Sequence, residues 1–182
     1  MLTLWDLIEP IRRALAGPGA VKAPRSRKAA APAVRARSPA TVPGPTAQDR
    51  YDAIVKELLG AHGIRVRKWR SSMSGVAWIT TYRDGSTVRC LESPRPKSPM
   101  SLAIFLHEVG HHVIGLGAYK PRCLEEYHAW MYALAEMERR GVPVTDRVKR
   151  RMDRSLRYAV AKASRRGLKA LPPELRRYAS PP

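Results

Sequence analysis

The sequence contains no long apolar segment and only two cysteines. No apolar run approaches the roughly 20 residues that a membrane-spanning helix needs, so no membrane partner is expected. The first residues lack the basic stretch of a secretory signal and include Asp6 and Glu9. Cys90 and Cys123 are not spaced as a metal-binding pair, and two cysteines do not make a disulfide framework. Together these absences predict a cytoplasmic protein.

Acidic residues are also scarce, with 15 Asp and Glu against 34 Lys and Arg, a net charge of +19 over 182 residues. The segment 141–182 alone holds 12 basic and 3 acidic residues, a net charge of +9. Basic surfaces attract nucleic acid because Lys and Arg neutralise phosphates and release counterions. No zinc-finger, Walker or RNA-recognition motif is present, so we expect nucleic acid as a partner only through this basic segment. A basic surface that merely aids solubility is the alternative.

Composition divides the chain into four regions. Residues 1–16 carry apolar residues at helical spacing, interrupted by Pro10, and predict a short amphipathic element. Residues 17–46 are rich in Ala, Pro and Arg and predict a flexible linker, because they hold too few large apolar residues for a core. Residues 47–141 are expected to form the main folded domain. Residues 142–182 are expected to form a basic helical extension.

A helix is predicted over residues 145–164 of this extension. Its apolar positions recur at intervals of four, which is the spacing of one buried helical stripe: Val148, Met152, Leu156 and Val160. Arginines occupy the remaining faces: Arg150, Arg151, Arg154 and Arg157. These arginines are the residues expected to lie on nucleic acid.

Residues 107–111 read HEVGH and match the zinc-hydrolase signature H-E-x-x-H. Residues four apart share one face of an α-helix, so His107 and His111 can offer ring nitrogens to one metal ion. A mostly apolar segment precedes the motif, and Gly115 and Gly117 follow it, which predicts a buried helix closed by glycine. We therefore expect His107 and His111 to bind Zn²⁺. The alternative is that both histidines are core residues that form hydrogen bonds and bind no metal.

A catalytic zinc site needs a third protein ligand, and a second helix predicted over residues 121–141 can supply it. Glu126 shares one helical stripe with Ala129 and Ala133. The small alanine side chains would let this helix approach the first one closely while Glu126 points at the metal. Glu126 is therefore the expected third ligand.

Two neighbours of Glu126 could replace it. Glu125 and His128 lie on an adjacent stripe, and either becomes the ligand if the helix is rotated. A solvated acidic face is the alternative for any single Glu here. Cys123 lies one turn before Glu126 and is expected to be a packed thiol rather than a further ligand.

Glu108 is the expected general base. It directly follows a ligand, so its carboxylate would face the metal-bound water, whose pKa zinc lowers to about 7. Glu108 would take a proton from that water and return it to the departing amine. Tyr119, Tyr127 and His128 are the candidates for stabilising the oxyanion, and the sequence does not select one of them. His112 lies off the ligand face and is expected to be exposed, with support of a metal ligand as the alternative.

The segment before the motif predicts a helix followed by three strands. Thr46 and Asp49 resemble a capping pair at the start of the helix. Alternating apolar residues then predict strands over 64–69, 76–82 and 87–91.

A hairpin is predicted between the last two strands. Asp84 and Gly85 indicate a two-residue turn, because such turns need positive φ. We expect a small antiparallel sheet of three strands, one edge of which could pair with an extended substrate. The prolines within 94–99 mark a loop expected at the rim of the cleft.

Two patterns together resemble a known family. HEVGH at 107–111 and ExxAxxxA beginning at Glu126 are similar to the ImmA/IrrE-type metallopeptidases, a gluzincin-like group with the pattern H-E-[LIV]-G-H followed by E-x-x-A-N-x-F-A. The likeness extends over roughly residues 48–140, with Trp130 and Tyr132 in place of Asn and Phe. It implies a cytoplasmic peptidase with one Zn²⁺, whose relatives cleave regulatory DNA-binding proteins, commonly in phage, mobile-element or stress settings.

The expected fold class is α+β: a zincin-like metallopeptidase domain with a small antiparallel sheet, the H-E-x-x-H helix and a helical C-terminal extension. The expected function is a zinc endopeptidase acting on a protein, for which a DNA-associated regulator is one candidate. A variant is a SprT-like, DNA-associated protease with His128 as third ligand. The alternative function is a basic nucleic-acid-binding protein with a structural or inactive zincin core. The oligomeric state is not predicted.

Overall fold

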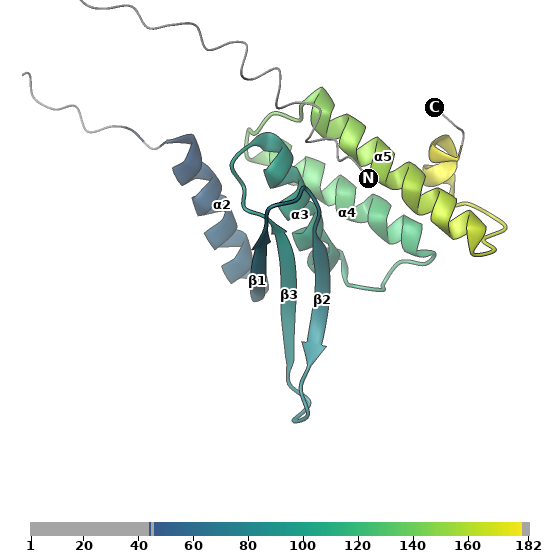
Figure 1. Ribbon diagram of the computed structural model, residues 1–182, viewed down its shortest axis with the longest axis horizontal. Helices are drawn as coiled ribbons and strands as arrows, with labels where there is room; N and C mark the ends of the chain where they lie inside the picture. Colours follow the sequence, from purple (N-terminus) through teal and green to yellow (C-terminus); the bar gives the residue numbers. More distant parts are fainter. Residues whose placement is uncertain (1–43, 45, 180–182) are drawn as a thin grey trace, which may run out of the picture. The chain divides into compact units, whose positions relative to one another are not determined.

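The computed structural model describes residue 44 and residues 46–179 (Figure 1). The elements in chain order are α2 (Ala47–His62), β1 (Ile64–Arg70), β2 (Val76–Thr81), β3 (Thr87–Pro94), α3 (Pro99–Ile114), α4 (Arg122–Arg139), α5 (Asp146–Arg165) and the short 3-10 helix η1 (Pro173–Tyr178). Several helices and one small sheet confirm the α+β class. The element expected at 1–16 and nearly all of the linker expected at 17–46 lie outside the described residues. Among the helices of the described residues, none has the length and apolar character to cross a membrane.

Side-chain caps set the starts of three helices. Thr46 and Asp49 form the predicted capping box of α2, in which each side chain accepts a hydrogen bond from the other residue's backbone N–H. Ser98 and Ser101 form a similar box before α3, and Thr145 caps α5. These caps satisfy backbone N–H groups that have no partner inside the helix.

The sheet is mixed, and the expectation of a fully antiparallel sheet is wrong. Its strand order is β1-β3-β2: β2 pairs antiparallel with β3, whereas β1 pairs parallel with β3. The last strand in the sequence therefore lies in the centre. Its buried residues include Cys90, Leu91 and Ser93, and it packs against α3 (Figure 1). Alternation of apolar residues fixes which face of a strand is buried, but it does not fix the order or direction of the strands.

The hairpin between β2 and β3 has a three-residue turn rather than the predicted two-residue turn. The Gly85 N–H donates to the Tyr82 carbonyl at 3.0 Å, and the Tyr82 N–H donates to the Ser86 carbonyl at 2.9 Å. Gly85 has φ 82°, whereas no other residue type in the described chain has positive φ. Asp84 therefore does not adopt the angles of a primed turn. Its carboxylate instead accepts hydrogen bonds from the Ser86 backbone and hydroxyl.

Helix α3 forms the centre of the core. Every residue from Met100 to His112 is buried, because the sheet, α2, α4 and α5 all contact this helix. The close approach of α3 and α4 depends on small residues. A Cβ added at Gly110 would lie 2.9 Å from the Ala129 carbonyl oxygen, and Ala129 and Ala133 are fully buried. The prediction that these alanines allow close helix packing is therefore confirmed.

Helix α5 packs against α4 and α3 (Figure 1). Its predicted apolar stripe of Val148, Met152, Leu156 and Val160 is buried as expected. Leu175 and Tyr178 of η1 are buried in the same core. The basic segment thus belongs to the same compact unit as the helix that carries the HEVGH motif.

Candidate metal centre

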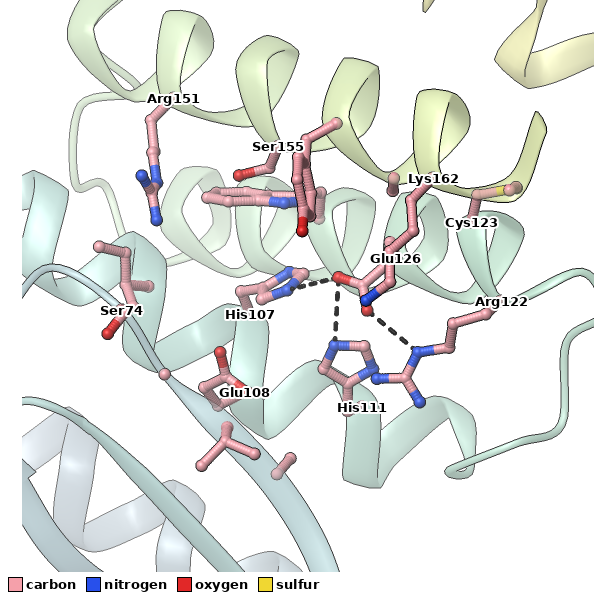
Figure 2. Close-up of a pocket in the computed structure, with 18 of the residues that line it drawn as sticks. Ser74, His107, Glu108, His111, Arg122, Cys123, Glu126, Arg151, Ser155 and Lys162 are labelled. Atoms are coloured by element: carbon pink, nitrogen blue, oxygen red, sulfur yellow. Dashed lines mark hydrogen bonds and ion pairs between the residues drawn. The ribbon is translucent and has the colours of Figure 1, made fainter. Parts of the chain in front are cut away.

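The HEVGH motif lies on α3, facing the first two turns of α4. His107 and His111 are one turn apart, and Glu126 of α4 points between their rings (Figure 2). The Glu126 Oε2 atom lies 3.2 Å from His107 Nε2 and 3.7 Å from His111 Nε2. One candidate ligand atom from each residue can be chosen so that all three lie within 4.8 Å of one another.

This geometry suits a transition-metal ion. In a tetrahedral zinc site with ligands near 2.0–2.1 Å, two ligand atoms lie about 3.3 Å apart. Both measured carboxylate–imidazole separations are close to that value. Two imidazole nitrogens and one carboxylate oxygen are also the donors that zinc accepts, and three protein ligands leave one position open. The residues therefore fit a bound Zn²⁺.

The alternatives to Glu126 lie elsewhere. The His128 ring stacks on Tyr119 at 4.1 Å between ring centroids and does not line the cavity of the site. Glu125 approaches the opposite nitrogen of His111: its Oε1 atom lies 2.9 Å from Nδ1. The two adjacent carboxylates therefore make different contacts, since Glu126 approaches the Nε2 atoms of both histidines and Glu125 approaches the Nδ1 atom of His111.

Glu125 is fully buried and held by several partners. It accepts a hydrogen bond from the Gly117 N–H at 2.8 Å, and the Arg122 guanidinium lies 3.1 Å from its Oε1 atom. A carboxylate at Nδ1 fixes the orientation of an imidazole and leaves Nε2 free for a metal. Glu125 thus positions His111.

His107 is positioned by packing instead. Its ring lies over that of Trp130, with centroids 4.6 Å apart, and its Nδ1 atom is buried without a hydrogen-bond partner among the described residues. Trp130 stands where the ImmA/IrrE-type pattern, which the sequence resembles, has Asn. Its ring therefore has a structural part in the site.

Burial and mutual contacts set the charge of the three candidate ligands. Burial lowers the pKa of His107, which favours the neutral imidazole that a metal needs. Burial alone would raise the pKa of Glu126, but its hydrogen bonds with His107 and His111 lower it strongly. Burial likewise opposes protonation of His111, yet the Glu126 carboxylate outweighs it and raises the pKa of His111. Glu126 is therefore an anion at neutral pH.

Glu108 borders the same cavity on the sheet side (Figure 2). It is 5% exposed, and its carboxylate forms no hydrogen bond with any residue in the described part of the chain. Burial raises the pKa of Glu108 to about 7. The backbone passes close to it at Gly75, where an added Cβ would lie 2.4 Å from a Glu108 carboxylate oxygen. Glycine at this position is therefore needed to keep the carboxylate in place.

The raised pKa of Glu108 predicts a pH-dependent loss of stability in metal-free protein. Between its ordinary pKa of 4.5 and about 7, Glu108 is protonated in the folded chain but ionised in the unfolded chain. Its stabilising contribution is thus complete below pH 4.5 and lost as the pH rises through 7. The free energy of unfolding of wild type relative to Glu108→Gln should fall by about 3 kcal/mol across this window. Urea unfolding of both proteins in the presence of a chelator measures this difference at each pH. If the free energy of unfolding of wild type and of Glu108→Gln changes equally with pH, the prediction is wrong.

The cavity has a volume of about 520 Å³ and is bordered by β2, α3, α4 and α5. Val76 and Ala77 of β2 form one wall, so the strand that borders the cavity is an edge of the sheet. The proline loop expected at the rim does not line it. Cys123 does line it, but its thiol is buried and outside the three-residue ligand group, as expected for a packed cysteine.

Several expectations about nearby residues need correction. His112 is 4% exposed rather than solvated, and its Nε2 atom lies 2.9 Å from the Cys90 carbonyl oxygen, which ties α3 to the sheet. Tyr119, Tyr127 and His128, the candidates for oxyanion stabilisation, do not line the cavity. Tyr158 of α5 does line it.

Four cavity residues on α5 were not predicted from the sequence. Arg151, Ser155, Tyr158 and Lys162 line the cavity at intervals of four, three and four. This spacing marks one helical face, and it was a signal that could have separated Arg151 from the other arginines of α5. The expectation of a single nucleic-acid surface does not distinguish Arg151 from Arg150, Arg154 and Arg157.

No protein-family model matches this chain, and comparisons with curated proteins and with solved structures found no match.

Proposed function

We propose that the protein is a zinc-dependent endopeptidase of the zincin type that cleaves a protein substrate. The observation that carries this proposal is the convergence of His107, His111 and Glu126 beside the buried Glu108 in one cavity (Figure 2). A purely structural metal site would not need an unpaired carboxylate next to an open coordination position.

The chain's residues would share the catalytic work as follows. His107, His111 and Glu126 would hold the ion, which when bound supplies Lewis acidity for the attack of water on a carbonyl group. Glu108 would accept a proton from the attacking water and deliver it to the departing amine. Burial raises the pKa of Glu108, whereas a bound cation would lower it, and these opposing effects favour a carboxyl group that can both accept and return a proton.

The position of β2 supports a peptide substrate. This strand has β3 on one side only, and its first residues line the cavity. The unpaired backbone groups of an edge strand can bind an extended chain through main-chain hydrogen bonds. A polypeptide bound along β2 would therefore pass close to Glu108.

Metal content and cleavage test the proposal together. Full-length protein should contain about one zinc ion per chain by mass spectrometry of the intact protein. It should cleave an unstructured protein such as casein, and a chelator should abolish cleavage until zinc is restored. Protein that contains no transition metal after incubation with zinc would refute the proposal. Cleavage that persists after metal removal would refute it equally.

The wider setting is also part of the proposal. The resemblance to ImmA/IrrE-type enzymes favours a cytoplasmic protease that acts on a DNA-associated regulator. The positive charge of the chain favours a substrate close to nucleic acid.

A second function, nucleic-acid binding, is favoured by a separate groove between α4 and α5. Its floor is partly apolar, with Met131, Leu134 and Met152, and its volume is about 910 Å³. Basic side chains surround it: Lys149, Arg150, Arg154, Arg157 and Arg177. If nucleic-acid binding is the main function, the metal centre would be structural or inactive. If both functions coexist, the groove would hold a protease on nucleic acid while it cleaves a protein.

Replacing Arg150 and Arg154 with Ala should weaken nucleic-acid binding and make it less dependent on salt. Each lost phosphate contact reduces the slope of log affinity against log salt by about one. Fluorescence titration of a labelled DNA duplex at 50–200 mM salt measures the slope. The matched control is Arg83→Ala with Lys97→Ala, which removes two exposed charges elsewhere on the domain. Equal slopes in both double variants would dismiss the groove as the contact.

A further inference from the structure

The wall of the cavity opposite the HEVGH helix is one face of α5. Six residues of α5 and its C-cap residue line it: Arg151, Ser155, Tyr158, Ala159, Lys162, Ala163 and Arg166. Their intervals of four, three, one, three, one and three place them on a single stripe, next to the buried apolar stripe. The helix therefore presents a polar and basic face to the metal centre (Figure 2).

The cavity has more positive than negative side chains. Four cations line it, namely Arg122, Arg151, Lys162 and Arg166, against the two carboxylates of Glu108 and Glu126. Glu126 already contacts both histidines and Arg122, whereas Glu108 lies on the sheet side and forms no ion pair with any described residue. A divalent ion at the metal centre would make the cavity still more positive.

Among the described residues, three of these cations have no acidic partner. Arg122 pairs with Glu125 and Glu126, whereas Arg151, Lys162 and Arg166 form no ion pair with any described residue. Arg151 donates through Nη2 to the Met73 carbonyl at 2.9 Å, which holds its side chain in place. Its Nε atom is buried and lacks a hydrogen-bond partner in the described part of the chain. A buried donor without a partner is costly unless a ligand satisfies it.

We propose that the basic face of α5 selects substrates that carry a carboxylate close to the bond that is cut. This inference rests on the proposed peptidase function and adds the substrate class. Lys162 and Arg166, which lie four residues apart on the exposed side of the cavity, would bind the carboxylate through charge-assisted hydrogen bonds. Arg151, half-buried and about three turns away along the helix, would add to the positive charge that attracts it. A neutral or basic residue at the same position would leave the cations unpaired.

The carboxylate could belong to an acidic side chain or to the end of a chain. Both present the same chemistry to a guanidinium or ammonium group. Phosphates of nucleic acid are a different ligand class. A half-open cavity of about 520 Å³ that lies between β2 and α5 favours a peptide segment over a nucleic-acid strand.

The test uses peptide hydroxamates, which chelate zinc and are bound without being cleaved. One series has the hydroxamate at the carboxyl end and another has it at the amino end, each with Glu, Gln or Lys beside it. The second series is made with both a free and an amidated carboxyl terminus. Calorimetry on the full-length, zinc-loaded protein measures each affinity, and a titration with zinc alone tests the metal centre separately.

The acidic hydroxamate should bind about tenfold more tightly than its Gln counterpart, the effect of one charge-assisted hydrogen bond, and the Lys counterpart most weakly. The preference should be lost in Lys162→Met with Arg166→Met, and reduced in Arg151→Met. The matched control is Arg165→Met, because Arg165 is exposed and does not line the cavity. If only the free carboxyl terminus raises affinity, the recognised group is a chain end; if only the Glu side chain does, it is a side chain.

Equal affinities for Glu, Gln and Lys would overturn the inference and leave the metal centre intact. A preference that survives in all the α5 variants would also overturn it. Displacement of the hydroxamate by a short single-stranded DNA would assign the cations to phosphates and overturn it likewise. If zinc itself does not bind, the proposed function fails, and this inference fails with it.

Discussion

Replacing Glu108 with Gln is expected to lower the rate of peptide hydrolysis by about 10²–10⁴-fold, the usual contribution of a general acid–base. The amide has nearly the shape of the carboxylate but cannot accept the proton of the attacking water. Glu108 is not one of the three candidate ligands, so zinc should stay at one ion per chain. Turnover of a cleavable peptide and metal content, measured on the same sample, check both parts.

The control is Glu138→Gln, which makes the same chemical change at an exposed position of α4. It should leave both turnover and zinc unchanged. Wild-type turnover in Glu108→Gln would show that another group moves the proton. Loss of zinc from Glu108→Gln would show instead that Glu108 helps to hold the ion, so the two failures are distinguishable.

Replacing Glu126 with Ala is expected to lower zinc affinity at least roughly a thousandfold, because one of three protein ligands is removed from a site whose affinity rests on all of them. The two histidines alone should not retain zinc against a competing chelator. Competition with a chromophoric chelator measures the affinity, and circular dichroism shows whether the variant is folded.

Two neighbouring substitutions make this result specific. Glu125→Gln should weaken zinc about 10–100-fold, because it removes the carboxylate that orients His111 but no ligand. His128→Ala should change nothing, since its ring stacks on Tyr119 away from the cavity. If His128→Ala loses the metal while Glu126→Ala keeps it, the third ligand is misassigned and α4 is rotated relative to the arrangement described here.

Much of the fold could be predicted because its signals are local. The capping box at Thr46, the buried helix of the HEVGH motif and the stripe from Val148 to Val160 all depend on residues a few positions apart. Within one helix or strand, spacing alone decides which side chains share a face. These predictions needed no knowledge of what packs against each element.

The strand order could not be predicted because it depends on distant contacts. Alternation located all three strands, yet it could not show that β3 would lie between β1 and β2. That arrangement buries Leu91 against α3, a contact between elements rather than within one. The same limit applies to His112, whose partner is a backbone carbonyl of β3.

The amino-acid sequence by itself determined a helix with two histidines and a glutamate in metal-binding order, and a second helix with acidic residues on the facing stripe. Only the tertiary structure decided that Glu126 meets both imidazoles while Glu125 supports one of them from behind. It also decided that the basic helix α5 closes the cavity. The reason is that helical periodicity fixes positions within a helix, whereas the rotation of one helix against another is set by packing among residues far apart in the chain.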